Sequence, residues 1–389
     1  MVEGRSDASA GGRIRLGMVG GGQGAFIGAV HRIAARIDDQ YQLVAGALSS
    51  QRQRAIDSAL DLGIARDRAY CTFEEMAKAE AKRKDGIEAV TIVTPNHMHA
   101  PAAKAFLKAG IHVICDKPLS LNVAEARELV RLTKRSGKIF ALTHNYTGYP
   151  MIRQARAMIA TGDLGDLRVV QAEYAQDWLT ERLEATGQKQ AEWRTDPKRS
   201  GAGGSIGDIG THAYNLACFV TGLTLESLCA DLSTLVRGRA LDDNDNILLR
   251  FKGGARGMLW ASQVAPGNEN GLQLRVYGTK GGLHWKQEDP NTLRFAPFGQ
   301  PPRLITRGGA GAGPEAGRVT LVPSGHPEGY LEGFANIYAE VARAIRAARS
   351  GRAPDPALIF PTVEDGLIGM RFVEAAVRSS SKGATWVKV

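Results

Sequence analysis

Short apolar runs alternate with amphipathic helical stretches over the first 147 residues. Runs typical of strands occur at residues 13–19, 41–48, 89–93, 111–115 and 138–142, and the run at 89–93 is rich in β-branched residues, as fully buried strands are. Helical stretches lie between them, among them residues 101–109 and 123–136, which end at Gly110 and Gly137. This alternation predicts βαβ units and a parallel sheet in a first domain of residues 13–147.

The pattern changes after residue 147. Helical stretches at residues 150–161 and 210–221 accompany strands with polar turns at residues 167–174, 227–236, 245–251, 255–262 and 272–278. Strands without intervening helices predict a large, mostly antiparallel open sheet in a C-terminal α+β domain of residues 148–389. Helices predicted at residues 330–350 and 363–379 close the chain, and they either complete this domain or pack back on the first. The glycine-rich residues 308–317 are predicted to form a mobile loop.

The chain carries a formal charge of +9 over 389 residues. Its densest basic run, Lys82-Arg83-Lys84, is flanked by Glu80 and Asp85, which is typical of a solvated helix end. We therefore expect no nucleic-acid partner, although a basic field favours an anionic small molecule.

No stretch of 18 apolar residues occurs, and the N-terminus lacks the apolar segment of a secretory signal. We expect no membrane-spanning helix and a cytoplasmic location. Cysteines at positions 71, 115, 218 and 229 form no C-x-x-C pair and stand at no zinc-ligand spacing. They are predicted to be reduced thiols, and no metal site is expected.

A glycine cluster follows the first strand and precedes a helix. It contains the pattern G-x-G-x-x-A at Gly20, Gly22 and Ala25, with Gln23 and Phe26 beside it. Glycines allow a close backbone approach to a pyrophosphate, and the helix start offers free N–H groups. The context predicts a Rossmann-type domain that binds NAD or NADP. Gly24, Ala25 and Gly28 each remain candidates for the third position of the fingerprint.

The end of the second strand reads Ala47-Leu48-Ser49-Ser50, with no carboxylate to bind the ribose diol of NAD. Ser49 and Ser50, with Arg54 nearby, would tolerate the 2′-phosphate of NADP. Alternatively, Ser49 caps the next helix and the neighbouring arginines face solvent.

Three more segments narrow the prediction. Thr94-Pro95-Asn96-His97-Met98-His99 and Cys115-Asp116-Lys117-Pro118 each follow a buried strand, and Asp208-Ile209-Gly210-Thr211-His212 lies near the start of a helix. Together with the glycine loop, these segments resemble the family of glucose–fructose oxidoreductase, inositol dehydrogenase and rhizopine-catabolism proteins. The resemblance runs from about Arg13 to the C-terminus and is densest in the first 220 residues.

The resemblance implies roles for individual residues. It places Lys117 between nicotinamide and substrate, with Pro118 fixing the turn, in a motif where the family has Glu and this chain has Asp116. It also places Thr94, Pro95, Asn96 and His99 near the cofactor. Asp208 and His212 match the family's Asp-x-Gly-x-His signature, and Asn215 stands where the family commonly has an acidic residue.

Hydride transfer from a carbinol carbon needs these residue types. A neutral imidazole such as His212 can accept the hydroxyl proton, and the Lys117 cation can stabilise negative charge on the oxygen. A carboxylate, Asp208, can orient the imidazole. Further substrate contacts are predicted at Asn145, Tyr146, Asp177, Trp178, Trp193, Arg194, Asn215 and His326.

The predicted function is an NAD(P)-dependent dehydrogenase acting on a secondary hydroxyl of a sugar, sugar derivative or cyclitol. One alternative is a glycoside hydrolase, acting on an anionic glycoside among others, that oxidises the sugar transiently with no net change of cofactor. Another is a non-catalytic module that senses NAD(P). The resemblance also implies a homodimer or homotetramer, since such open sheets often pack face to face.

Overall fold

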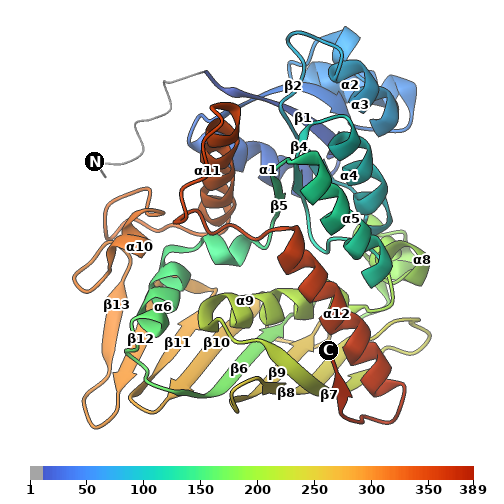
Figure 1. Cartoon of the computed structure of the whole chain (residues 1–389). Coiled ribbons are helices and arrows are strands. Elements are labelled where there is room, and N and C mark those ends of the chain that lie inside the picture. The colour runs from blue at the N-terminus through green and yellow to red at the C-terminus, as the bar shows by residue number, and fades with distance from the viewer. Residues whose placement is uncertain (1–11) are drawn as a thin grey trace. The chain divides into compact units, whose positions relative to one another are not determined.

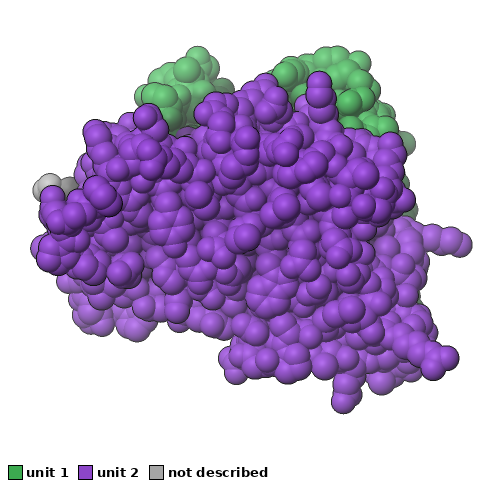
Figure 2. All heavy atoms as spheres, turned by 90° about the horizontal axis from the view of Figure 1, so that it is seen from below, with its two compact units in different colours: residues 1, 3–148, 330–367 green, residues 2, 149–329, 368–389 purple. Residues whose placement is uncertain are grey.

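The computed structural model describes residues 12–389, which divide into two compact units. The first unit contains the described residues up to Gly148 together with Tyr330–Leu367, and the second contains Tyr149–Gly329 with Ile368–Val389 (Figure 2). Residues 1–11, which the prediction about a secretory signal concerned, lie outside the described part of the chain.

The first unit is built on a five-stranded parallel sheet, as predicted. Its strand order is β2-β1-β3-β4-β5. The strands are β1 (Ile14–Gly20), β2 (Tyr41–Ala47), β3 (Ala89–Val93), β4 (His112–Cys115) and β5 (Phe140–Leu142). All five residues of β3 are buried, which explains its continuous apolar sequence. The carboxyl ends of β1, β3 and β4 therefore meet at one edge of the sheet.

Two helices of the first unit begin directly after residues whose side chains cap them. The helices of this unit are α1 (Phe26–Ile37), α2 (Arg52–Asp61), α3 (Phe73–Glu80), α4 (His99–Lys108), α5 (Val123–Ser136) and α11 (Tyr330–Arg349). The Thr72 and Asn122 side chains accept hydrogen bonds from Glu75 N and Glu125 N and so cap α3 and α5. Gly137 ends α5 with a φ of 64°. Helix α3 was not among the helices predicted from the sequence.

Helix α11 belongs to the core of the first unit although it lies far along the chain. Phe334 and Ile337 from α11 join Leu16 of β1 and Val30 of α1 in one buried cluster. Within it, the Tyr338 hydroxyl lies 2.8 Å from His31 Nδ1 and 2.8 Å from Thr91 Oγ1. These contacts hold α1, β3 and α11 together.

The second unit is built on a nine-stranded sheet in the order β13-β12-β11-β10-β6-β9-β8-β7-β14. The strands are β6 (Leu167–Ala175), β7 (Leu225–Ser233), β8 (Asn244–Phe251), β9 (Arg256–Ser262), β10 (Gly271–Gly278), β11 (Gly281–Lys286), β12 (Asp289–Pro297), β13 (Arg303–Thr306) and β14 (Val387–Lys388). Only the β6–β9 pairing is parallel, so the prediction of a mostly antiparallel sheet is confirmed. Strands β11 to β14 were not predicted.

Helices cover one face of this sheet. Helices α6 (Pro150–Ala160) and α9 (Thr211–Thr221) lie over it, with α12 (Val363–Ser380) beyond them (Figure 1). Buried and exposed residues alternate along β8, where Ile247 and Leu249 are buried and Leu248 is exposed. One face of β8 is therefore core and the other is open.

The glycine-rich segment is more ordered than the predicted loop. It contains the short helix α10 (Pro314–Gly317), and Gly313 N donates a hydrogen bond of 2.6 Å to Gln154 Oε1. The residues that follow are held by a buried ion pair of 2.8 Å between Arg307 and Glu328. Two further short helices are α7 (Lys189–Arg194) and α8 (Pro197–Ser200).

The described residues bear on two predictions, the one about membrane-spanning helices and the one about the cysteines. Between residues 12 and 389, no helix is both long and apolar enough to cross a membrane. The four cysteines, all of them described, form no disulfide.

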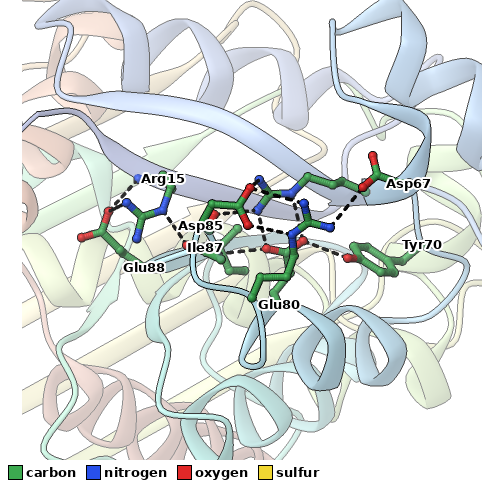
Figure 3. Close-up of polar contacts among 10 residues, drawn as sticks. Arg15, Asp67, Tyr70, Glu80, Asp85, Ile87 and Glu88 are labelled. Carbon is green, nitrogen blue, oxygen red and sulfur yellow. Dashed lines mark hydrogen bonds and ion pairs between the residues drawn. The ribbon is translucent and has the colours of Figure 1, made fainter.

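Buried polar contacts of Glu80 fasten the end of α3 to the turn at Arg68 and to the loop before β3 (Figure 3). The Glu80 side chain is fully buried and pairs with the Arg68 guanidinium, which is 8% exposed. Glu80 also accepts hydrogen bonds from the Tyr70 hydroxyl at 2.8 Å and from Ile87 N at 3.1 Å. The carboxylate thus accepts from three residues in two segments, the stretch before α3 and the loop before β3.

Replacing Glu80 should therefore destabilise the first unit. The change Glu80→Ala removes the buried carboxylate from the Arg68 guanidinium and leaves it with Asp85, whose Oδ2 lies 3.6 Å away. Breaking a buried ion pair typically costs about 3–5 kcal/mol. Urea unfolding followed by circular dichroism measures the loss. Asp67→Ala is the matched control, because Asp67 pairs with Arg83 at the surface and is 66% exposed. An equal loss in both variants would contradict the role given to burial.

Candidate active site

The glycine loop after β1 is shaped by backbone conformations that only glycine adopts readily. Gly20, Gly21 and Gly24 have φ values of 77°, 72° and 76°. A Cβ added to Gly28 would lie 2.4 Å from the Gly21 Cα, and one added to Gly22 would lie 2.6 Å from Leu48 O. The helix and the loop approach so closely that neither position has room for a side chain. Gly28 thus does what the third fingerprint glycine does, whereas Ala25 is the N-cap residue of α1.

Side chains from α2 hold the loop from outside. Arg54 Nη2 donates a hydrogen bond of 2.6 Å to Gln23 O, and Ser58 Oγ accepts one of 3.2 Å from Gln23 N. The Gln23 side chain donates to Asp61. Phe26, the first residue of α1, leaves 67% of its side chain exposed.

The side chain of Ser49 forms a turn ahead of α2 and does not cap the helix, whose N-cap residue is Gln51 with no side-chain cap. Ser49 Oγ accepts a hydrogen bond of 3.1 Å from Gln51 N, just before α2 begins at Arg52. Ser50 is exposed. Arg54 binds a loop carbonyl and lies one helical turn further on.

The segment after β3 packs against the glycine loop. A Cβ on Gly20 would lie 2.9 Å from Thr94 Cγ2. Thr94 Oγ1 is buried and has no hydrogen-bond partner among the described residues. Pro95 precedes a short 3-10 helix (Asn96–Met98), in which Asn96 is buried. His99 is 1% exposed, and its two ring nitrogens lie 2.6 Å from Pro118 O and 2.8 Å from Thr94 O.

The turn after β4 carries Lys117. Asp116 Oδ1 accepts hydrogen bonds from Lys117 N at 2.9 Å and from Thr143 Oγ1 at 3.0 Å. The Lys117–Pro118 peptide is cis. The shorter carboxylate of Asp116 therefore caps its own turn and ties it to the segment after β5.

Buried imidazoles surround this turn. Burial lowers the pKa of His31 to about 4 and that of His144 to about 3, and the Lys117 ammonium adds to the effect at His144. Burial also lowers the pKa of His99. Among these rings, His31 and His144 are neutral at neutral pH.

Two predicted substrate residues follow β5 in the 3-10 helix Asn145–Gly148. Both Asn145 and Tyr146 are buried. The Tyr146 ring lies 6.5 Å from that of Tyr330 in α11. Asn145 Nδ2 has no hydrogen-bond partner within residues 12–389, so this amide is available for a ligand.

In the second unit, Asp208 lies in one turn of π-helix (Ile206–Gly210) directly before α9. Such turns are frequently found at functional sites. Asp208 Oδ2 accepts hydrogen bonds from Gln263 Nε2 at 2.8 Å and from Arg194 Nε at 3.2 Å. The Asp-x-Gly-x-His motif identified Asp208, and Arg194 was predicted as a substrate contact beside Trp193. No motif signalled Gln263, which immediately follows β9.

Aromatic side chains gather beside this carboxylate. The Arg194 guanidinium lies 4.2 Å above the Trp193 ring and 6.0 Å from the Trp178 ring. Asp177 Oδ2 accepts a hydrogen bond of 3.3 Å from Gly267 N. The structure thus brings together four of the residues that the sequence proposed for the site, Trp178, Trp193, Arg194 and Asp208.

His212 lies in the first turn of α9 and is 8% exposed, with its ring 6.2 Å from that of Tyr174. Asn215 Oδ1 is buried and makes no hydrogen bond to a described residue. His326 is different, because its side chain is exposed and its backbone carbonyl is bound by Arg307.

A buried carboxylate outside the predicted set shapes the segment that carries Asp208. Asp242 accepts hydrogen bonds of 2.8 Å from Gly204 N and 2.8 Å from Ile206 N. Burial raises the pKa of Asp242 and raises that of neighbouring Asp245 further. No group of His, Cys, Asp and Glu side chains between residues 12 and 389 is arranged to hold a metal ion.

These features fit a dinucleotide. The space at Gly22 and Gly28 that a Cβ would fill permits close backbone approach, and Thr94 Oγ1 at the same edge offers a polar group without a partner. The start of α1 has no side-chain cap, so its N–H groups face the loop.

Comparison with known proteins agrees with this geometry. The profile of the "Oxidoreductase family, NAD-binding Rossmann fold" matches residues 14–144, and that of the "GFO/IDH/MocA C-terminal domain" matches residues 152–284. The chain belongs to the GFO/IDH/MocA oxidoreductase family. The predicted resemblance is confirmed, and the first unit is an NAD-binding Rossmann domain.

Solved structures of relatives cover nearly the whole chain. An oxidoreductase from Sinorhizobium meliloti is 60% identical with a TM-score of 0.88, and the match covers 97% of this chain and 99% of that one. An inositol dehydrogenase homolog from Azotobacter vinelandii, complexed with NADH and myo-inositol, is 36% identical with a TM-score of 0.90, covering 97% and 98%. Levoglucosan dehydrogenase of Pseudarthrobacter phenanthrenivorans is 28% identical over 73% of this chain and 76% of its own length.

The close approach at Gly28 makes a testable prediction. Gly28→Ala should weaken NAD binding at least tenfold, because the added methyl must push α1 away from Gly21. A tenfold loss of affinity requires a change in binding free energy of only about 1.4 kcal/mol. Fluorescence titration with NAD measures the dissociation constant. Gly317→Ala is the control, since a Cβ there meets nothing within 4 Å. Unchanged NAD affinity in Gly28→Ala would show that the loop tolerates the displacement.

Proposed function

We propose that this oxidoreductase transfers a hydride between NAD and a secondary hydroxyl of a sugar, sugar derivative or cyclitol. The observation that carries the proposal is the Asp208 cluster, in which a carboxylate, a guanidinium and indole rings lie together. Indole faces pack on the apolar faces of sugar and cyclitol rings, while charged groups bind hydroxyls. The relatives solved or named with myo-inositol and levoglucosan support the same substrate class.

In this proposal the chain's own residues handle the proton and the charge on oxygen. His212 accepts the proton of the reacting hydroxyl, and the Lys117 ammonium stabilises the negative charge that develops on that oxygen. Asp208 fixes the turn that leads into His212. Bound NAD supplies the hydride acceptor.

The remaining site residues have proposed roles in recognition. Asn145 and Asn215 each have a buried amide atom without a partner among the described residues, which suits a hydroxyl of the substrate. The other proposed contacts to substrate are Tyr146, Asp177, Trp178, Trp193, Arg194 and His326. The proposed contacts to NAD are Gly20, Gly22, Gln23, Ala25, Phe26, Thr94, Pro95, Asn96, Asp116 and Lys117.

We also propose that NADP is accepted. No carboxylate follows β2, so Ser49 and Ser50 present no negative charge to a 2′-phosphate, and Arg54 provides a nearby cation. An Asp or Glu at this place would repel the phosphate.

A homodimer or homotetramer is proposed from the open face of the nine-stranded sheet. Leu248 and Met258 are 49% and 46% exposed there, and they line a groove of about 440 Å³ with Trp260. Exposed apolar patches of this kind mark interaction sites.

A panel of free sugars, inositols and glycosides, each offered with NAD and with NADP, tests the function. Reduced cofactor should accumulate, followed at 340 nm, with at least one free sugar or inositol. Release of aglycone without net reduced cofactor would instead identify a redox-neutral glycosidase. Binding of cofactor without either reaction would favour a sensing module.

The role of His212 predicts a specific kinetic change. His212→Asn should preserve substrate affinity but slow oxidation about 10²–10⁴-fold, the usual contribution of a general base. Wild-type oxidation should slow at acid pH as the imidazole becomes protonated, and the variant should lose this dependence. A mild loss with unchanged pH dependence would leave His212 as a positioning group and assign the base to another residue.

A further inference from the structure

Both ring nitrogens of His99 lie within hydrogen-bond distance of backbone carbonyls in two loops at the same edge of the parallel sheet. It is the first residue of α4, and only 1% of it is exposed. Nδ1 lies 2.6 Å from Pro118 O, in the turn after β4, and Nε2 lies 2.8 Å from Thr94 O, in the segment after β3. One imidazole therefore bridges the Lys117 turn and the Thr94 segment.

The chemistry of these contacts leaves the ring no polar atom for a ligand. Carbonyl oxygens only accept hydrogen bonds, so a neutral His99 ring donates to one of them and an imidazolium donates to both. Burial lowers the pKa of His99 and the nearby Lys117 ammonium opposes protonation, whereas the Asp116 carboxylate favours it. His31 is the other titratable ring close to it. In either charge state, the ring holds at least one of the two carbonyls.

The Lys117 turn is therefore fixed at both of its ends. On one side, Asp116 Oδ1 accepts from Lys117 N and from Thr143 Oγ1. On the other side, the carbonyl of Pro118, the residue after Lys117, lies against His99. The backbone that carries the Lys117 side chain has an anchor before it and an anchor after it.

We infer that His99 is a positioning residue, which aims Lys117 by donating a hydrogen bond from Nδ1 to the carbonyl of Pro118 while its Nε2 edge lies against the Thr94 segment. It acts through Lys117 and does not contact the reacting atoms. The inference rests on the proposed role of Lys117. It also gives His99 a different task from the direct cofactor contact that the sequence resemblance implies.

Three substitutions at His99 separate the two contacts. The amide nitrogen of Asn can replace Nδ1, and that of Gln can replace Nε2, so His99→Asn keeps the bond to Pro118 and His99→Gln keeps the bond to Thr94. His99→Leu removes both. We expect kcat to fall in the order wild type, His99→Asn, His99→Gln, His99→Leu. The His99→Leu variant should be about 10²-fold slower than wild type, the loss typical of a misplaced catalytic group. The dissociation constant of NAD should change much less than kcat in all three.

A double-variant comparison tests whether the effect passes through Lys117. If it does, adding His99→Leu to Lys117→Ala should lower kcat little further. The inference would be overturned if the double variant lost kcat by the product of the two single losses. It would also be overturned if His99→Gln were as active as His99→Asn. His97→Asn, two residues earlier in the same segment, is the matched control and should retain kcat.

The same experiment distinguishes this inference from the proposed function. A fully active Lys117→Ala would contradict the role of Lys117, whatever His99 does. An inactive Lys117→Ala with a fully active His99→Leu would contradict only the positioning role. If His99→Leu does not fold, as judged by circular dichroism, the comparison of Asn with Gln still decides between the two contacts.

Discussion

The contact between Gly21 and Gly28 sets the position of α1 against the end of β1, and the rest of the cofactor edge depends on it. A Cβ on Gly28 would lie 2.4 Å from the Gly21 Cα, so the two backbones touch directly. This brings the uncapped start of α1 to the edge where β1, β3 and β4 end. The Thr94 segment packs against Gly20 at the same edge. His99 lies between the Thr94 segment and the Lys117 turn, so all three loops are in contact there.

Two carboxylates, one in each unit, hold the segments that carry the proposed catalytic groups. Asp116 binds the Lys117 amide and Thr143, and Asp208 binds Arg194 and Gln263. Each accepts donors from segments distant in the chain, so each fixes a short turn against the body of its unit. Hydrogen bonds to a carboxylate are stronger than those between neutral groups, which suits this positioning task.

Much of the architecture was predictable because it depends on local patterns. The parallel strands of the first unit, the mostly antiparallel sheet of the second, and the family motifs were all predicted from the sequence and are confirmed. The sequence did not predict strands β11 to β14 or helix α3. Strands β11 and β12 include glycines, prolines and charged residues, and they form strands because β10 offers its edge to β11.

The sequence by itself determined which residues bear chemistry: the glycine turn, Lys117 before its proline, and the Asp208–His212 segment. Each of these depends on residues that are neighbours in the chain. Only the tertiary structure decided that Gln263 shares Asp208 with Arg194, across 55 and 14 positions of the chain, and that His99 bridges two loops. These contacts depend on which strands lie side by side. Strand order is set by the packing of the whole sheet, and a local sequence pattern does not contain that information.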